Sequence, residues 1–175
     1  MTRLLQIAQL GHPVLRQQTA EVEDVTERSV RELIDDMMTT VVDADGVGIA
    51  APQVYRSERI MILASRPNAR YPDAPMMEPT AAINPEILWR SEQMEKGWEG
   101  CLSIPGVRGL VPRSVSVGVR YRTRDGESLE REYEGFLARV FQHEVDHLDG
   151  IVFFDRLEST KDIFMEKEYR KLLNG

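Results

Sequence analysis

The sequence is poor in cysteine and histidine and has no long apolar run. Its single cysteine, Cys101, cannot form an intramolecular disulfide, which excludes a disulfide-stabilised secreted domain and favours a reducing compartment. No stretch approaches the roughly 18 consecutive apolar residues of a membrane span, and the first residues lack the apolar run of a signal peptide. We therefore expect a cytoplasmic protein without membrane contact, or an organelle stroma or matrix protein whose transit peptide has been removed.

Basic residues are also in deficit. Lysine and arginine number 22 against 29 aspartate and glutamate, a formal net charge of −7. Domains that bind nucleic acid usually carry a basic surface, so we expect no direct nucleic-acid substrate. A content of 42% hydrophobic and 29% charged residues is typical of a globular protein, and 175 residues suit one domain, 1–175.

Periodicity and turn residues divide the chain into short strands and three helices. Apolar residues at three- and four-residue steps from Val30 to Val42 predict a helix, with Asp24 or Thr26 as its N-cap and an end at Asp45-Gly46. The strands precede the second helix instead of alternating with helices, which favours an α+β fold of short mixed or antiparallel sheets. The proline-rich segment 65–80 is expected to be a loop, and no role is assigned to it. The other expected elements are strands over 59–64, 81–89, 94–98, 114–122 and 128–133, a hairpin turn at 125–126, and helices over 136–148 and 159–173.

Two of the three histidines lie in the segment QHEVDH, residues 142–147, which contains an H-E-x-x-H pattern. His143 and His147 are four residues apart on a predicted helix, so both imidazoles can bind one metal ion. Glu144 projects about 100° away from His143, where it can act on water at an open coordination position. The pattern predicts a metal-activated hydrolase. Two surface histidines without a metal are the alternative.

A site with two histidines needs a third protein ligand. The metzincin position six residues after His147 holds Phe153, which cannot coordinate a metal. Glu158 and Glu166 are formal candidates in the charged C-terminal segment. Cys101, within EGCLS, is the remaining soft donor; its glycine and proline neighbours predict a turn with an accessible thiolate, although lone cysteines are often simply buried.

The segment GVGIAAPQ, residues 46–53, contains G-x-G-x-x-A. It does not fit a dinucleotide-binding fingerprint, because a predicted helix precedes it and Pro52 follows at once. Gly46 and Gly48 allow close approach to the backbone, and Gln53 offers an amide donor. An ordinary tight turn is the alternative.

Taken in order, GVGIAAPQ, EGCLS and QHEVDHLDG resemble the signature motifs of the peptide deformylases, and the resemblance extends over nearly the whole chain. It implies sheets around a central metal-binding helix, and removal of the formyl group from the N-terminal formylmethionine of nascent polypeptides. It also implies that Cys101, His143 and His147 bind one divalent ion, with Fe2+ expected and nickel, cobalt or zinc as substitutes. Thiolate and imidazole donors do not discriminate sharply among these ions.

The resemblance assigns the remaining site residues as well. Glu144 would be the general acid and base, and the Gln53 side-chain amide and Leu102 backbone N–H would stabilise the oxyanion. An apolar slot would receive the methionine side chain, while Arg139 breaks the apolar pattern and is expected to contact the peptide. The expected substrate-binding residues are Gly46, Val47, Gly48, Phe136, Arg139 and Val140.

Ligating histidines usually donate their second N–H to a carboxylate or carbonyl. Glu99, Arg113 and Asp146 are therefore candidates for a supporting charge network, with solvated surface charges as the alternative. An endoprotease and a non-catalytic, ribosome-associated binding module are the alternative functions. Ribosome docking by the C-terminal helix, known for some relatives of the family, is a further expectation.

Overall fold

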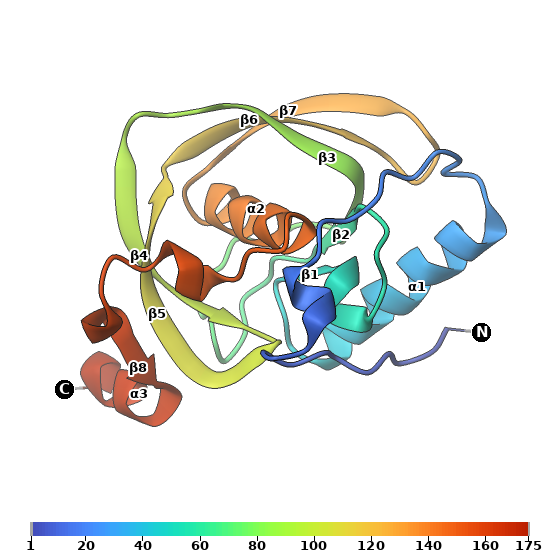
Figure 1. Cartoon of the computed structure of the whole chain (residues 1–175). Coiled ribbons are helices and arrows are strands. Elements are labelled where there is room, and N and C mark those ends of the chain that lie inside the picture. The colour runs from blue at the N-terminus through green and yellow to red at the C-terminus, as the bar shows by residue number, and fades with distance from the viewer. Residues whose placement is uncertain (1, 175) are drawn as a thin grey trace.

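The computed structural model describes residues 2–174, in which two antiparallel sheets lie around one central helix, α2 (Gly135–Leu148) (Figure 1). This confirms the predicted α+β fold. The larger sheet has the order β1 (Gly48–Ala50), β2 (Ile60–Leu63), β3 (Thr80–Arg90), β6 (Ser116–Arg122), β7 (Ser128–Glu134). The smaller sheet has the order β4 (Met94–Cys101), β5 (Ile104–Ser114), β8 (Ile163–Met165). The remaining helices are α1 (Arg28–Asp43), α3 (Glu166–Asn174) and the 3-10 turns η1 (Pro13–Arg16), η2 (Ala51–Val54), η3 (Phe153–Arg156) and η4 (Thr160–Asp162).

Strand β2 shows why the predicted strand 59–64 is apolar at every position. Ile60 and Ile62 belong to the core that also contains the buried face of α1, whereas Met61 and Leu63 pack with α2. A strand covered on both faces needs apolar residues throughout instead of alternating ones. The larger sheet is thus sandwiched between α1 and α2, and this packing fixes the position of the histidine-bearing helix.

Helix α1 begins later than its sequence suggests. Its N-cap is Glu27, and Asp24 instead accepts hydrogen bonds from the backbone N and hydroxyl of Thr26, in a turn before the helix. The predicted caps, Asp24 and Thr26, were therefore wrong, because short polar side chains also stabilise turns. Val42 is 40% exposed although its stripe predicted burial.

The C-terminal prediction was also wrong in part. Instead of one helix over 159–173, the chain forms η4, the edge strand β8 and α3, because Ile163–Met165 pair with residues 107–109 of β5. Strand β5 itself was not predicted, since Pro105 and Pro112 suggest a break. Both prolines fall where β8 does not pair with β5, so β5 has a single neighbour there and tolerates them.

The N-terminal segment before α1 joins distant loops by backbone hydrogen bonds. Ala8 N donates to Gln53 O, and Leu10 N donates to Ser103 O, each at 2.8 Å. Farther along, Thr19 N donates to Leu148 O at the end of α2. Within residues 2–174, no helix has the length and apolar character needed to cross a membrane.

Candidate metal centre

The three predicted metal ligands come together at the meeting of β4 and α2. Cys101 is the last residue of β4, and His143 and His147 lie one turn apart on α2. One donor atom of each residue lies within 4.8 Å of the others, and Cys101 Sγ is 3.3 Å from His147 Nε2. All three residues are buried. Within the part of the chain that the structure describes, no other cluster of this kind was found.

Cys101 does not sit in an exposed turn, as its neighbours suggested. It is 3% exposed and packs in a small core with Val111 and Phe153, because the tight connection to β5 folds that strand back over it. The pairing of β4 with β5 is irregular between Glu99 and Cys101. Such irregularities redirect side chains beside functional sites, and here the sulfur faces α2.

The donor set fits a divalent metal ion. His143 Nδ1 contacts Glu99 Oε2 at 2.8 Å, which leaves its Nε2 for the cluster, and one thiolate with two imidazoles suits zinc, iron or nickel. Burial raises the pKa of the Cys101 thiol, but the neighbouring imidazoles outweigh this and hold its pKa well below the ordinary value. Gln53 Nε2 and Ser103 N also donate to the sulfur, at 3.5 and 3.4 Å. The thiolate is the form that binds metals.

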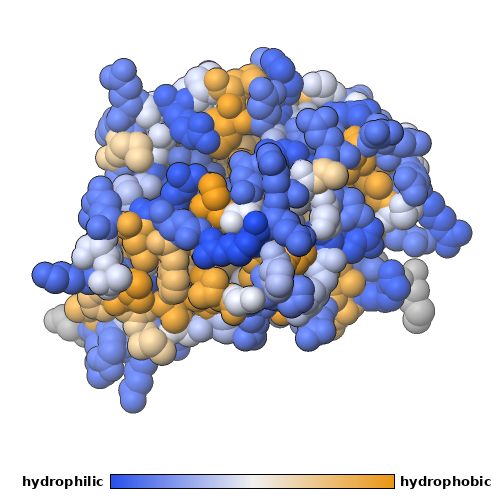
Figure 2. All heavy atoms as spheres, viewed as in Figure 1, coloured by the Kyte–Doolittle hydropathy of each residue, from blue (hydrophilic) through white to orange (hydrophobic). Residues whose placement is uncertain are grey.

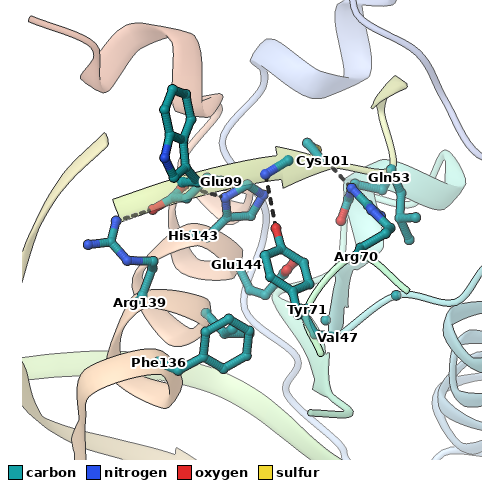
Figure 3. Close-up of a pocket in the computed structure, with 16 residues that line it drawn as sticks. Val47, Gln53, Arg70, Tyr71, Glu99, Cys101, Phe136, Arg139, His143 and Glu144 are labelled. Carbon is teal, nitrogen blue, oxygen red and sulfur yellow. Dashed lines mark hydrogen bonds and ion pairs between the residues drawn. The ribbon is translucent and has the colours of Figure 1, made fainter. Parts of the chain in front are cut away.

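Glu144 lies beside the cluster without a hydrogen-bond partner for its Oε2 among the described residues. The side chain is buried, and this burial raises its pKa to about 7. Gly48 lies so close that an added Cβ would be 2.5 Å from Glu144 Oε1. Figure 3 shows Glu144, His143 and Cys101 around the same space. A buried carboxyl group that titrates near neutral pH is suited to proton transfer.

Glu99 is the centre of the predicted charge network. It accepts two hydrogen bonds from Arg113, at 2.9 and 3.0 Å, and one from Arg139, in addition to its contact with His143. Arg113 also pairs with Asp146. Because Glu99, Arg113 and Asp146 are all buried, the network is confirmed and solvated surface charges are excluded. By contrast, His147 Nδ1 has no partner in the described structure.

The open side of the cluster is a pocket that contains every residue expected to bind substrate. Four residues that line it were not predicted from the sequence: Arg70 and Tyr71, which belong to the loop 65–80, and Trp98 and Gly100. Tyr71 is the only aromatic residue in that loop, which was the one available signal. The residues that line the pocket are Gly46, Val47, Gly48, Gln53, Arg70, Tyr71, Trp98, Glu99, Gly100, Cys101, Leu102, Phe136, Arg139, Val140, His143 and Glu144.

Arg139 reaches the pocket, but its guanidinium is engaged within the protein. It donates to the Glu99 carboxylate (Figure 3). It also donates to the backbone oxygens of Gly97, Val111 and Glu95. These contacts favour a supporting role for Arg139, through Glu99, over direct contact with a peptide.

The alternative third ligands lie elsewhere. Glu158 pairs with Lys96 and Glu166 pairs with Arg108, and neither belongs to the cluster. Phe153, at the metzincin position, stacks on the His143 ring with centroids 6.1 Å apart.

A central helix that presents H-E-x-x-H to a cysteine from a neighbouring strand defines a class, the metal-dependent hydrolases. Comparison with known proteins narrows the class. The sequence profile described as polypeptide deformylase matches residues 4–162, and the chain belongs to this family. Its members remove the N-formyl group from formylmethionine peptides, and the chain is a hydrolase of this kind.

Individual relatives agree with this assignment. The chain is 54% identical over 170 residues to peptide deformylase 2 of Nostoc sp., covering 97% of this chain and 95% of the relative. Among solved structures, the class I type b peptide deformylase of Acinetobacter baumannii bound to Met-Ala-Ser has a TM-score of 0.87 at 48% identity, covering 90% of this chain and 100% of the other. The enzyme of Thermotoga maritima has a TM-score of 0.80 at 38% identity, covering 90% and 99%.

Proposed function

We propose that Cys101, His143 and His147 hold one divalent metal ion and that Glu144 moves the proton during hydrolysis of the formyl group. The observation that carries this proposal is the buried Glu144 carboxyl, whose Oε2 has no partner among the described residues, beside three metal-donor atoms. A buried polar group without a partner costs free energy, so its position is best explained by the reaction. When bound, the metal ion supplies Lewis-acid chemistry that polarises the formyl carbonyl and acidifies water.

The chain's own groups complete the reaction. Glu144 takes a proton from the attacking water and returns it to the nitrogen of the leaving amine, as the new C–O bond forms and the C–N bond breaks. The products are formate and a peptide with a free amino terminus. No covalent intermediate with the protein is required.

Gln53 and Leu102 are proposed to stabilise negative charge on the formyl oxygen. The Gln53 carbonyl oxygen accepts from Ala50 N at 2.9 Å, so its NH2 end is fixed toward Ser103 and Cys101. The backbone N–H of Leu102 is the second proposed donor. Each such donor typically lowers an activation barrier by about 3–4 kcal/mol.

The pocket is proposed to bind the formylmethionine end of the peptide. Val47, Phe136 and Val140 supply apolar side chains for the methionine, and Gly46 and Gly48 line the pocket beside them. The Met-Ala-Ser complex of the Acinetobacter enzyme supports this class of ligand, since the two structures share their fold. The peptide residues that follow the methionine would then extend out of the pocket on the side away from the formyl group.

The finer assignments are proposals as well. We propose that the resident ion is Fe2+ and that nickel, cobalt or zinc can replace it. Residues 1–175 are proposed to act as one catalytic domain. The lone cysteine favours a reducing compartment, in line with a cytoplasmic or organelle-matrix location. Ribosome docking by the C-terminal segment is tested by deleting residues 159–175, and unchanged co-sedimentation with ribosomes would contradict it.

Elemental analysis of anaerobically purified protein, together with formate release from a formyl-Met dipeptide, tests the central proposal. Wild type should contain one iron per chain and release formate. Cys101→Ala should lose the metal, whereas Glu144→Gln should keep it and lose about 10²–10⁴-fold in turnover. Full turnover of Glu144→Gln would remove this residue from the reaction.

A further inference from the structure

One side of the pocket, here called the outer wall, consists of Arg70 and Tyr71 from the loop 65–80 and Trp98 from β4. Tyr71 is tied to the rest of the pocket. Its hydroxyl accepts from Gly100 N at 3.0 Å, and its ring lies against Phe136 with centroids 5.2 Å apart (Figure 3). The loop therefore has a defined place over the pocket.

Arg108 of β5 lies behind this wall with a side chain that is 0% exposed. Its guanidinium packs on the rings of Tyr71 and Tyr169, at 4.9 and 5.2 Å from their centroids. Nε donates to Glu166 Oε2 at 2.6 Å, and Nη2 donates to the backbone oxygen of Arg70 at 3.5 Å. A buried cation is costly unless it is paired, and the Glu166 carboxylate supplies this pairing, while Nη1 has no partner among the described residues. Arg108 thus connects two outer-wall residues with helix α3.

The C-terminal segment 163–174, formed by β8 and α3, supports the third outer-wall residue. Phe164 and Tyr169 both pack on Trp98, each with ring centroids 5.0 Å apart. The match to the family profile ends at residue 162, before this segment. Figure 1 shows the segment against β5, on the far side of that strand from α2. Every outer-wall residue therefore contacts either Arg108 or the C-terminal segment.

Apolar side chains are also exposed along the C-terminal segment, among them Met165, Leu172 and Leu173. Figure 2 shows apolar residues gathered over the region of β5 and the C-terminal segment, at the lower left of the view. Two aromatic residues of the segment, Phe164 and Tyr169, contact Trp98, whose side chain lines the pocket.

We propose that Arg108 is a positioning residue that transmits the support of the C-terminal segment to the outer wall, and that this wall binds the peptide residues after formylmethionine. The inference rests on the peptide orientation proposed above. With the formyl group at the Cys101 cluster and the methionine beside Phe136 and Val140, the rest of the peptide passes the outer wall. Aromatic side chains held in place bind a ligand at low entropic cost.

The test compares a long and a short substrate. Formate release is measured from formyl-Met-Ala-Ser and from formyl-Met amide, for wild type and for Arg108→Met and Glu166→Gln. Both substitutions should raise KM for the tripeptide by about tenfold. Arg108→Met removes the buried cation–π contacts with Tyr71 and Tyr169, and Glu166→Gln removes the carboxylate that holds the Arg108 guanidinium in place. KM for formyl-Met amide should stay within about twofold, and kcat and metal content should not change.

Glu168→Gln is the matched control. Glu168 lies on the same helix and, among the residues that the structure describes, pairs only with the exposed Lys171. The substitution should leave both KM values unchanged. If Arg108→Met does not fold, Glu166→Gln, whose side chain is partly exposed, carries the test. Equal changes for the two substrates, no change, or a fall in kcat with metal loss would each overturn the positioning role. Failure of wild type to release formate would instead overturn the proposed function, and this inference with it.

Discussion

Replacing Gly48 by alanine tests whether the position of the Glu144 carboxyl controls the rate. The added Cβ would lie 2.5 Å from Oε1 and 2.9 Å from Cγ and Cδ of Glu144. Ordinary contact begins at 3.4 Å, so the carboxyl must move by about 0.9 Å. A misplacement of about 1 Å can cost about 100-fold in rate, or about 2.7 kcal/mol in activation free energy. Gly48 is not in the left-handed backbone region, so alanine adds no backbone strain.

The assay is kcat for formate release, with metal content measured on the same samples. Because the three nearest atoms to the added Cβ all belong to Glu144, the metal ligands should be undisturbed and the metal content unchanged. Glu144→Asp shortens the side chain and relieves the overlap, so Gly48→Ala should cost much less in that background than in wild type. Wild-type kcat in Gly48→Ala with full metal content would refute the reasoning.

Three further predictions concern the buried network. Glu99→Gln should weaken metal affinity by about 10–100-fold in a competition titration, because His143 loses the carboxylate that orients it; unchanged affinity would show that Glu99 has no such role. Asp146→Asn should lower the free energy of unfolding, measured in urea, by about 3 kcal/mol, because the buried charge of Arg113 then has one partner fewer. A loss of stability near zero would show that the Arg113–Asp146 pair does not stabilise the fold. Burial raises the pKa of both carboxyl groups, but Arg113 beside Glu99, and Arg156 together with Arg113 beside Asp146, hold the two pKa values below the ordinary values of 4.5 and 3.8. The contribution of both groups to stability is therefore complete above about pH 4.5 and is lost as the pH falls through the folded-state pKa values. Stability measured against pH should therefore fall less steeply on the acid side in Asp146→Asn, and parallel curves would contradict this.

The helix with His143 and His147 could be predicted from the sequence because its signals are local. A helical period places the two imidazoles together without knowledge of any other element. The same holds for β2, whose continuous apolar run reflects its two covered faces. Cys101 was different, since only the resemblance to the family singled it out among several candidate ligands.

Other features depend on contacts between distant segments and left no local pattern. Tyr71 reaches the pocket through Gly100, 29 residues away, and the surrounding prolines indicate only a loop. Arg108 looks like an ordinary strand charge until Tyr71 and Tyr169 enclose it. Ile163–Met165 became a strand because β5 offered an unpaired edge, which local helix propensity cannot reveal.

The backbone contacts of the N-terminal segment have a consequence for how the enzyme matures. The bond from Thr19 to Leu148 closes a loop of 129 residues, and the bonds from Ala8 and Leu10 hold the loops that carry Gln53 and Ser103. Chains dominated by such non-local contacts fold slowly, on a scale of about milliseconds to seconds. The chain loses conformational entropy when it closes these long loops, before the contacts between the segments stabilise it. Because the Thr19–Leu148 contact and the proposed ligand His147 both need the chain as far as residue 148, the cluster is complete only when most of the polypeptide is present.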